Sequence, residues 1–200
     1  MDGPAAIIEA FNPSTQGADA LAATVFGREN RWGKLPYTMY PASYITEQPM
    51  LQFSMTAPPG RTYRYYTGKP LYPFGYGLSY VKFGVTCTAG AVTAGNPVPP
   101  VDCTVTNPGS MTGDEVVMVF HSAGDDIRSR LTQPVPIKAL VGFERVTVDA
   151  GASSTVSFAL TSKALELTTA RGDREVYTGT HHLVFTNGAG EETTVTVTVA

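Results

Sequence analysis

Apolar and polar residues alternate along much of the chain after residue 80. Val156, Phe158 and Leu160 alternate with polar residues, and Val195, Val197 and Val199 alternate with threonines. This pattern predicts strands with one face in a core and the other in solvent. Turn signals such as Asn107-Pro108-Gly109 and Asn187-Gly188 separate the segments. Strands are therefore expected at 81–88, 101–106, 115–121, 137–141, 144–148, 155–160, 181–186 and 193–199.

A different period marks the start of the chain. Apolar residues spaced by three and four positions predict a helix at 16–26, with Ser14 or Thr15 capping its first amides and Gly27 ending it. The apolar run Ala5-Ala6-Ile7-Ile8 predicts a short strand at 5–9. One strand and one helix need neighbours on a larger sheet. Residues 1–36 are therefore interpreted as the remnant of an α/β domain.

Residues 37–80 show no clean period and hold 11 of the 20 aromatic residues. Frequent prolines block helices and central strands there. The segment is expected to be an extended connector that buries its rings against something else. The fold class predicted for the whole chain is mainly β: an immunoglobulin-like or fibronectin type III-like sandwich at 81–200, preceded by this arm and the α/β remnant.

Composition narrows the class of protein. The chain has 200 residues, is 42% hydrophobic and 16% charged, and carries a net charge of −3. These values exclude a disordered tail and a coiled coil, and no apolar run is long enough to span a membrane. Without a cluster of Lys and Arg, neither nucleic acid nor an anionic membrane surface is an expected partner.

Chemistry-bearing residues are few. The adjacent acidic pairs Asp114-Glu115, Asp125-Asp126 and Glu191-Glu192 lie beside turns, where solvated charge is expected, and neighbouring strand residues point to opposite faces. The three histidines, His121, His181 and His182, fall at strand ends and are expected at the surface or an edge. No spacing typical of a metal site, a nucleophile elbow or a phosphate loop occurs. The sequence therefore predicts no catalytic residue, no metal and no cofactor.

Two features leave alternatives open. Cys87 and Cys103 lie on the first two expected strands, so antiparallel pairing would allow a disulfide, whereas the other possibility is two buried thiols. The arm aromatics can contact sugar rings or pack between domains, and packing is favoured by the Pro and Gly content. The aromatics in question are Tyr63, Tyr65, Tyr66, Tyr72, Phe74 and Tyr76.

Several motifs resemble glycoside hydrolase family 3. The segment 17–40 is similar to the end of that family's α/β-sandwich domain, with Phe26-Gly27, Leu35-Pro36 and Tyr40 among the matches, although Lys34 stands where Arg is usual. The run 70–80, PLYPFGYGLSY, resembles a specific motif of the family. Residues 105–117 and 140–146 resemble the fibronectin type III-like domain at the C-terminus of these enzymes. The segment 134–146 is slightly more similar to the β-xylosidases of the family than to its bacterial β-glucosidases.

The resemblance implies a C-terminal accessory part of a secreted, retaining β-xylosidase or β-glucosidase. The nucleophile, an Asp in an N-terminal barrel, and the general acid/base in the α/β domain would both lie upstream, so no catalytic residue is carried over. The implied partners are those upstream domains and, through them, a β-linked oligosaccharide. No secretion signal is visible at 1–4, so an extracellular location rests on the resemblance alone.

Two other functions are weighed against this one. A stand-alone carbohydrate-binding sandwich would use Tyr63, Tyr65 and Tyr66 as its platform. Cell adhesion would use the tripeptide Arg171-Gly172-Asp173, which is more simply interpreted as an ordinary loop.

Overall fold

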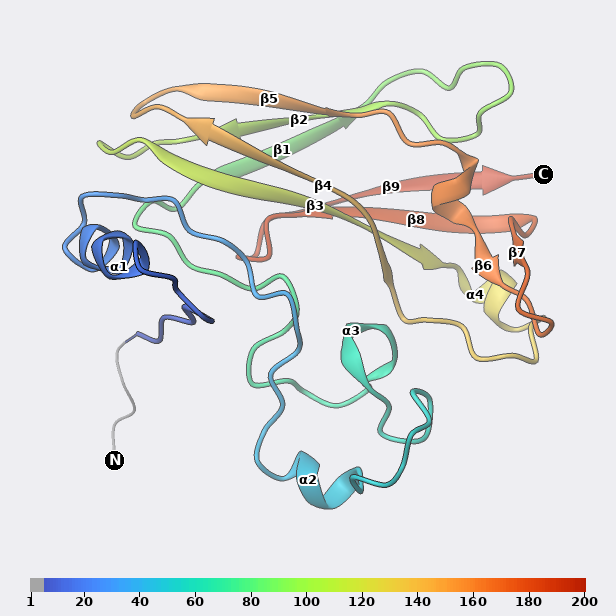
Figure 1. Cartoon of the computed structure of the whole chain (residues 1–200). Helices are drawn as coiled ribbons and strands as arrows, with labels where there is room; N and C mark the ends of the chain where they lie inside the picture. Colours follow the sequence, from blue (N-terminus) through green and yellow to red (C-terminus); the bar gives the residue numbers. More distant parts are fainter. Residues whose placement is uncertain (1–5) are drawn as a thin grey trace.

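The computed structural model describes residues 6–200 (Figure 1). The strands are β1 (Gly84–Ala89), β2 (Val101–Thr106), β3 (Gly113–Ala123), β4 (Ala139–Val148), β5 (Ser153–Phe158), β6 (Leu167–Thr168), β7 (Arg174–Glu175), β8 (Gly179–Thr186) and β9 (Glu192–Val199). The helices are α1 (Gly17–Val25), α2 (Tyr44–Glu47), α3 (Thr62–Tyr65), α4 (Asp125–Arg128) and the 3₁₀ turn η1 (Ser162–Leu165).

Two antiparallel sheets form the predicted sandwich. One sheet has the order β1-β2-β5 and the other β4-β3-β8-β9, while β6 and β7 make a separate hairpin. Figure 1 shows the two sheets as stacked layers. The main core lies between them and includes Val105 from one sheet, and Val119 and Phe185 from the other. The mainly β, fibronectin type III-like fold class is confirmed.

Cys87 lies directly opposite Cys103 in the β1–β2 ladder. The structure joins the two side chains in a disulfide bond, with an S–S distance of 2.09 Å. Both residues face the main core, because the alternation of β1 and β2 directs them inward and the neighbouring threonines outward. The bridge therefore fastens an edge strand to the middle strand of its sheet.

Two of the predicted strands, 137–141 and 144–148, are one strand, β4. Its pairing with β3 shifts between Val119 and Phe120, so that Val141 has no partner in the register. This bulge changes which residues share a face. The alternation in the sequence is interrupted at the same place, and this interruption led to the prediction of two strands. That prediction was wrong, because β4 continues through the bulge. The two-residue strands β6 and β7 were not predicted.

Helix α1 forms where the spacing predicts it and ends as predicted. Gly27 has φ +68°, its N–H donates to the Thr24 carbonyl, and the Arg28 N–H donates to the Ala23 carbonyl. This is a Schellman C-terminus. The side chains of Ser14 and Thr15 do not cap the helix, whose N-cap is Gln16. The strand predicted at 5–9 is also wrong over its described residues, since 6–10 pair with no other strand.

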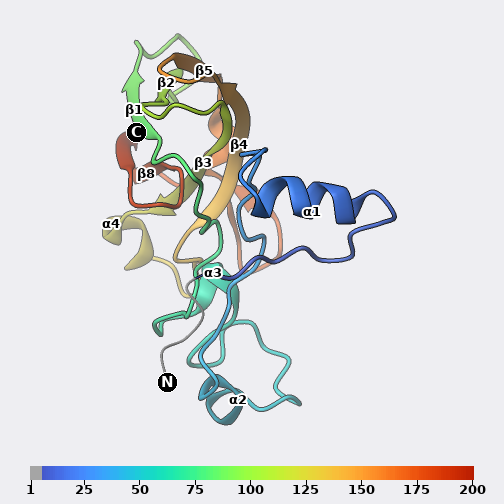
Figure 2. The same cartoon turned by 90° about the vertical axis from the view of Figure 1, so that its left-hand side faces the viewer.

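Residues 30–80, which are the predicted connector 37–80 and the seven residues before it, form a third layer below the sandwich (Figures 1 and 2) and are called the arm from here on. This arm contacts the side of the β4-β3-β8-β9 sheet that faces away from β1-β2-β5. It is mostly extended, as expected, but the short helices α2 and α3 interrupt it. Met39 and Tyr72 form an isolated bridge that holds the outgoing and returning halves together.

We expect loss of the disulfide to lower the stability of the sandwich. The bridge closes a loop with a sequence separation of 16 residues. Constraining a loop of that size in the unfolded chain is worth about 3 kcal/mol. The double variant C87A/C103A should lose roughly this free energy of unfolding in urea. A reductant should lower the stability of the native protein but leave the double variant unchanged, and equal sensitivity of both proteins would contradict the prediction.

Candidate functional site

The arm meets the sandwich through an aromatic cluster. The rings of Tyr63 and Phe74 stack with centroids 4.3 Å apart, and Phe120 of β3 approaches Tyr63 edge-on at 5.8 Å. The backbone N–H of Leu140 donates to the Tyr63 hydroxyl at 3.3 Å. Offset and edge-on contacts of this kind add roughly 0.5–1.5 kcal/mol per pair beyond burial. The cluster therefore anchors the returning half of the arm to the sheet.

Glycines allow the closest approach between the arm and the sandwich. A Cβ atom on Gly75 would lie 2.8 Å from the Met118 methyl group, and one on Gly188 would lie 1.9 Å from the Gly75 carbonyl oxygen. Both glycines have positive φ angles, +84° and +71°. The Gly75-Tyr76-Gly77 sequence is thus a packing element and not a phosphate loop.

A buried ion pair joins the arm to β3. The Lys34 ammonium lies 2.8 Å from the Glu115 carboxylate, and the two side chains are 8% and 4% exposed. Lys34 also donates to the Gly77 carbonyl, and the Asn187 side-chain amide donates to the second oxygen of Glu115. Such a pair is tolerated in an interior because both charges keep hydrogen-bonding partners.

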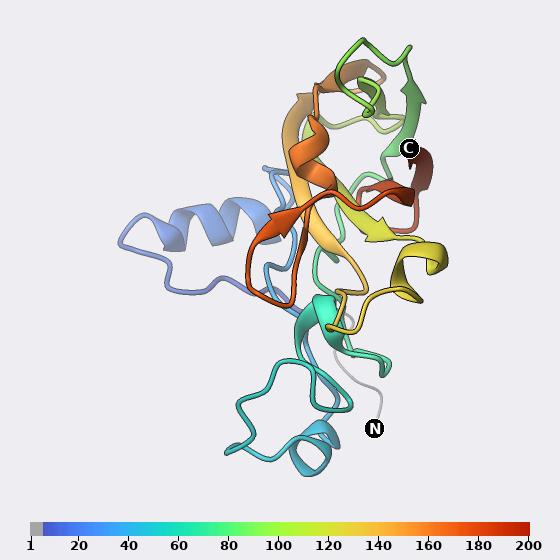
Figure 3. The same cartoon turned by 90° about the vertical axis from the view of Figure 1, so that its right-hand side faces the viewer.

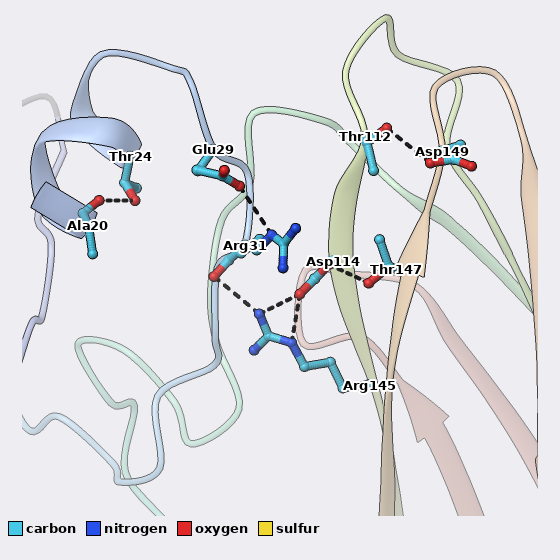
Figure 4. Close-up of polar contacts among 9 residues, drawn as sticks. All are labelled: Ala20, Thr24, Glu29, Arg31, Thr112, Asp114, Arg145, Thr147 and Asp149. Atoms are coloured by element: carbon cyan, nitrogen blue, oxygen red, sulfur yellow. Dashed lines mark hydrogen bonds and ion pairs between the residues drawn. The ribbon is translucent and has the colours of Figure 1, made fainter. Parts of the chain in front are cut away.

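A second ion pair lies at the edge of the same interface (Figure 4). The Arg145 guanidinium donates twice to one oxygen of Asp114, at 2.7 and 2.9 Å, and once to the Arg31 carbonyl of the arm. Thr147 donates to the other Asp114 oxygen. Burial raises the pKa of Asp114, but the hydrogen bonds from Arg145 and Thr147 outweigh it and hold that pKa below its ordinary value.

The expectation of solvated charge was wrong for Asp114 and Glu115, because each finds a basic partner distant in the sequence. Their side chains contact different partners and form no facing acid/base pair. Asp125 and Asp126 are exposed, and Asp126 accepts a hydrogen bond from the Thr180 backbone. Glu192 is exposed and Glu191 is partly exposed.

Asn30 fixes the point where the arm enters the interface. It is 1% exposed, its side-chain oxygen accepts hydrogen bonds from Ser79 and from the Tyr80 N–H, and its carbonyl accepts one from the Asp114 N–H. One residue thus joins both ends of the arm to β3. The sequence analysis assigned Asn30 no role, because its partners at 79–80 and 114 are distant in the sequence.

Far from the sandwich, the arm builds a small lobe around stacked tyrosines. The rings of Tyr40 and Tyr44 stack 3.9 Å apart, and Tyr66 meets both edge-on. Tyr44 donates to the Gly60 carbonyl, and the Thr62 N–H donates to the Tyr40 hydroxyl. These contacts hold the loop 45–55 in place.

Of the six singled-out aromatics, Tyr63 and Phe74 pack on the sheet, Tyr66 is buried in the lobe, and Tyr72 stacks on Tyr76 at 5.3 Å. Tyr65 is partly exposed at the end of α3. Packing is therefore the role that most of these contacts describe, and sugar contact by any of the rings stays a prediction.

Large apolar side chains remain exposed at the start of the chain and in the lobe of the arm. We call this set the apolar face, and its members are Ile7, Val25, Phe26, Ile45, Met50, Leu51 and Phe53. Phe26 is 79% exposed, Leu51 and Phe53 are each 83% exposed, and α1 has no buried residue. In Figures 2 and 3, α1 projects sideways from the molecule and the α2 lobe lies at its lower end. Exposed apolar surface of this kind marks an interaction site.

The histidines are not where the sequence predicted them. His121 and His181 are buried, and the Nε2 atom of His121 lies 2.9 Å from Nδ1 of His181. Burial, followed by the charges of His181, Arg128 and Arg174, lowers the pKa of His121 to about 4. Both were taken for strand ends, but the observed strands extend further, to Ala123 and back to Gly179. His182 is partly exposed and contacts Thr196.

The remaining candidate features are the Arg171-Gly172-Asp173 tripeptide, a metal site and a membrane helix. Arg171, Gly172 and Asp173 are exposed in the turn between β6 and β7, which leaves adhesion untested. Within residues 6–200, no three His, Cys, Asp or Glu side chains gather as metal ligands would. A search of the same residues finds no helix with the length and apolar character of a membrane span.

The fold and the interface together describe a fibronectin type III-like β-sandwich domain with an aromatic arm packed on its outer sheet. Residues 2–80 match the glycosyl hydrolase family 3 C-terminal domain, and residues 115–189 match the fibronectin type III-like domain. Together these matches place the chain in glycoside hydrolase family 3, and it corresponds to the C-terminal portion of such proteins.

The similar proteins are named as β-xylosidases and β-glucosidases. A probable exo-1,4-β-xylosidase from Aspergillus oryzae is 33% identical over 90% of this chain, and a xylan 1,4-β-xylosidase from Xylanibacter ruminicola is 35% identical over 80% of it. The β-glucosidase DesR from Streptomyces venezuelae superposes with a TM-score of 0.70 at 30% identity, over 92% of this chain and 25% of its own. The exo-β-xylosidase XlnD gives 0.72 at 27% identity, over 92% and 27%. This chain spans 25% of the A. oryzae relative and 17% of the X. ruminicola one.

We expect the Lys34–Glu115 pair to be essential for docking of the arm. Replacing one partner leaves the other charge buried and unpaired, so K34M should cost about 3–5 kcal/mol in free energy of unfolding. The double variant K34M/E115Q should recover most of that loss. The control is R174M, because Arg174 and Glu166 are 55% and 25% exposed and lie 3.5 Å apart. R174M should lower the free energy of unfolding by at most about 1 kcal/mol. A loss in K34M no larger than the loss in R174M would contradict the prediction.

Proposed function

We propose that this chain is the C-terminal accessory part of a larger family 3 β-glycosidase, an exo-acting β-xylosidase or β-glucosidase. The observation that carries the proposal is the apolar face, in which large apolar side chains of α1 and of the 45–55 loop are exposed. The arm packs on the sandwich through its aromatic cluster and its ion pairs, whereas the apolar face is exposed. The partner it fits is the upstream part of the same polypeptide.

The catalytic chemistry belongs to that upstream part. Glycoside hydrolysis needs two carboxylates that face each other across the substrate, whereas the buried carboxylates Asp114 and Glu115 are each bound to a basic side chain. The relatives support the substrate class, because those described above are named as β-xylosidases and β-glucosidases. An extracellular location is part of the proposal, and a disulfide is most persistent in oxidising compartments.

The native mass of the protein tests this proposal first. An antibody against 81–200 should detect a secreted band several-fold above 21.2 kDa. Protein captured by that antibody should hydrolyse 4-nitrophenyl β-xyloside or β-glucoside, whereas the isolated chain should hydrolyse neither. A band at 21.2 kDa would instead favour the stand-alone binding module.

The apolar face gives a second test. In the large enzyme, L51D/F53D should reduce thermal stability and activity, because each carboxylate would be buried against the upstream domains. The isolated chain should keep its own stability, since these two side chains are 83% exposed in it. The control V92D changes a 61% exposed residue in the loop between β1 and β2, at the far side of the sandwich (Figure 1). An equal effect of V92D, or none of L51D/F53D, would argue against docking through this face.

A further inference from the structure

An exposed loop of unusual composition joins α2 to α3. Residues 48–60, which we call the lobe loop, contain no Asp, Glu, Lys or Arg. Met50 is 86% exposed, and Leu51 and Phe53 are each 83% exposed. Figure 3 shows the loop at the lower end of the molecule, beside α2. An uncharged loop that presents three large apolar side chains to solvent is typical of an interaction surface.

The backbone of the lobe loop is held by polar groups of the loop itself. The Gln52 N–H donates to the Pro49 carbonyl at 2.9 Å. The Ser54 hydroxyl accepts hydrogen bonds from the N–H groups of Thr56 and Ala57, at 3.3 and 3.1 Å. The Ser54 N–H donates to the side-chain oxygen of Gln52 at 3.0 Å. These bonds shape the loop without using its apolar side chains, which are therefore available to a partner.

Arg61, the residue after the lobe loop, fastens it from the other side. The Nη2 atom of its guanidinium donates to the Gln52 carbonyl and, at 3.5 Å, more weakly to the Pro49 carbonyl. Its own N–H donates to the Met55 carbonyl at 2.9 Å, and its Nε atom is buried. Hydrogen bonds from a charged donor are stronger than those between neutral groups. One side chain thus holds three points of the loop backbone together.

The lobe loop belongs to the apolar face, and the occupant that fits it best is the upstream part of the same polypeptide. This chain spans 25% of DesR and 27% of XlnD, so about three quarters of each of those proteins lies outside the matched region. An anionic membrane is a poor fit, because residues 48–60 hold no basic side chain and the guanidinium of Arg61 binds carbonyls.

We propose that Arg61 preforms the lobe loop for docking, and that Met50, Leu51 and Phe53 then fill an apolar pocket of the upstream part. The inference rests on the proposed function and deepens it by naming a positioning residue and the side chains that it presents. A loop that is ordered before it binds loses less conformational entropy on docking. Arg61 acts on the docking through the backbone of the loop, without contacting the pocket.

Hydrogen exchange on the 200-residue chain tests whether the loop is preformed. The amide of Gln52 reports the loop, and the amides of β2 report global unfolding. The Gln52 amide should exchange roughly 10-fold more slowly than in an unstructured peptide. R61M should remove most of this protection and leave β2 unchanged, whereas R61K should restore part of it, because an ammonium can still donate to a carbonyl. The control R171M changes an exposed arginine and should keep native rates.

Three results would overturn the preformed loop. One is an unprotected Gln52 amide in the native chain, and another is unchanged protection of that amide in R61M. The third is an equal loss of protection in β2 for both R61M and R61K, because Arg61 would then support the whole chain and not the loop.

Oxidation of methionine by hydrogen peroxide tests the docking, since the reaction follows the exposure of the sulfur. In the large enzyme, Met50 should be oxidised at least roughly 10-fold more slowly than in the 200-residue chain. Met118 is 4% exposed and should resist oxidation in both, which controls for unfolding. R61M in the large enzyme should raise the rate at Met50 several-fold, and R171M should not. Equal rates at Met50 in the large enzyme and in the chain would overturn the docking.

Other occupants give different results. Protection of Met50 that grows with the concentration of the 200-residue chain would assign the loop to a second copy. Protection by phosphatidylcholine vesicles would assign it to a lipid surface, and either result would overturn the occupant proposed here. Absence of the large enzyme in the antibody experiment would overturn the proposed function and this docking together, whereas an unprotected Met50 in an existing large enzyme would overturn the docking alone.

Discussion

Strand β3 is apolar on both of its faces, and the architecture follows from that constraint. Val117 and Val119 point into the sandwich core, whereas Met118 and Phe120 lie on the opposite face. Leaving a Met or Phe side chain in water forgoes roughly 1.5–3 kcal/mol. The arm covers these two residues with Gly75 and with the Tyr63–Phe74 stack. Sandwich and arm are therefore one packing unit, although a simple sandwich would need only two layers.

Much of this could be predicted from the sequence where the signal is local. The alternation of apolar and polar residues predicted the sandwich strands, because this pattern can be seen in residues that are adjacent in the sequence. Helix α1 and its glycine C-terminus followed from spacing in the same way. The unbroken run from Val116 to Phe120 is itself typical of a strand buried on both sides. The Gly75-Tyr76-Gly77 segment resembled a family motif, but its role, a close approach to Met118 and Gly188, needed the structure.

The errors concern residues whose environment is set by distant partners. Asp114 and Glu115 read as solvated turn residues, yet their partners Arg145 and Lys34 lie 31 and 81 positions away in the sequence. His121 and His181 are 60 positions apart, and only the β3–β8 register brings them together. The strand expected near Ile7 failed for the opposite reason: its local pattern was apolar, but within the described residues no neighbouring strand is present to pair with it.

The contacts between the arm and the sandwich differ in kind from those that the apolar face can make. Toward the sandwich, a buried ion pair, an Arg145 bridge and glycine contacts each demand one geometry, so they specify register more than they add free energy. Lys34, at a position where the family usually has Arg, fits this role because one ammonium can donate both to Glu115 and to the Gly77 carbonyl. The exposed apolar face instead offers non-directional burial, which contributes free energy without fixing a register. In the proposed function, the first kind of contact holds the arm in shape on the sandwich, and the second supplies the burial against the upstream domains.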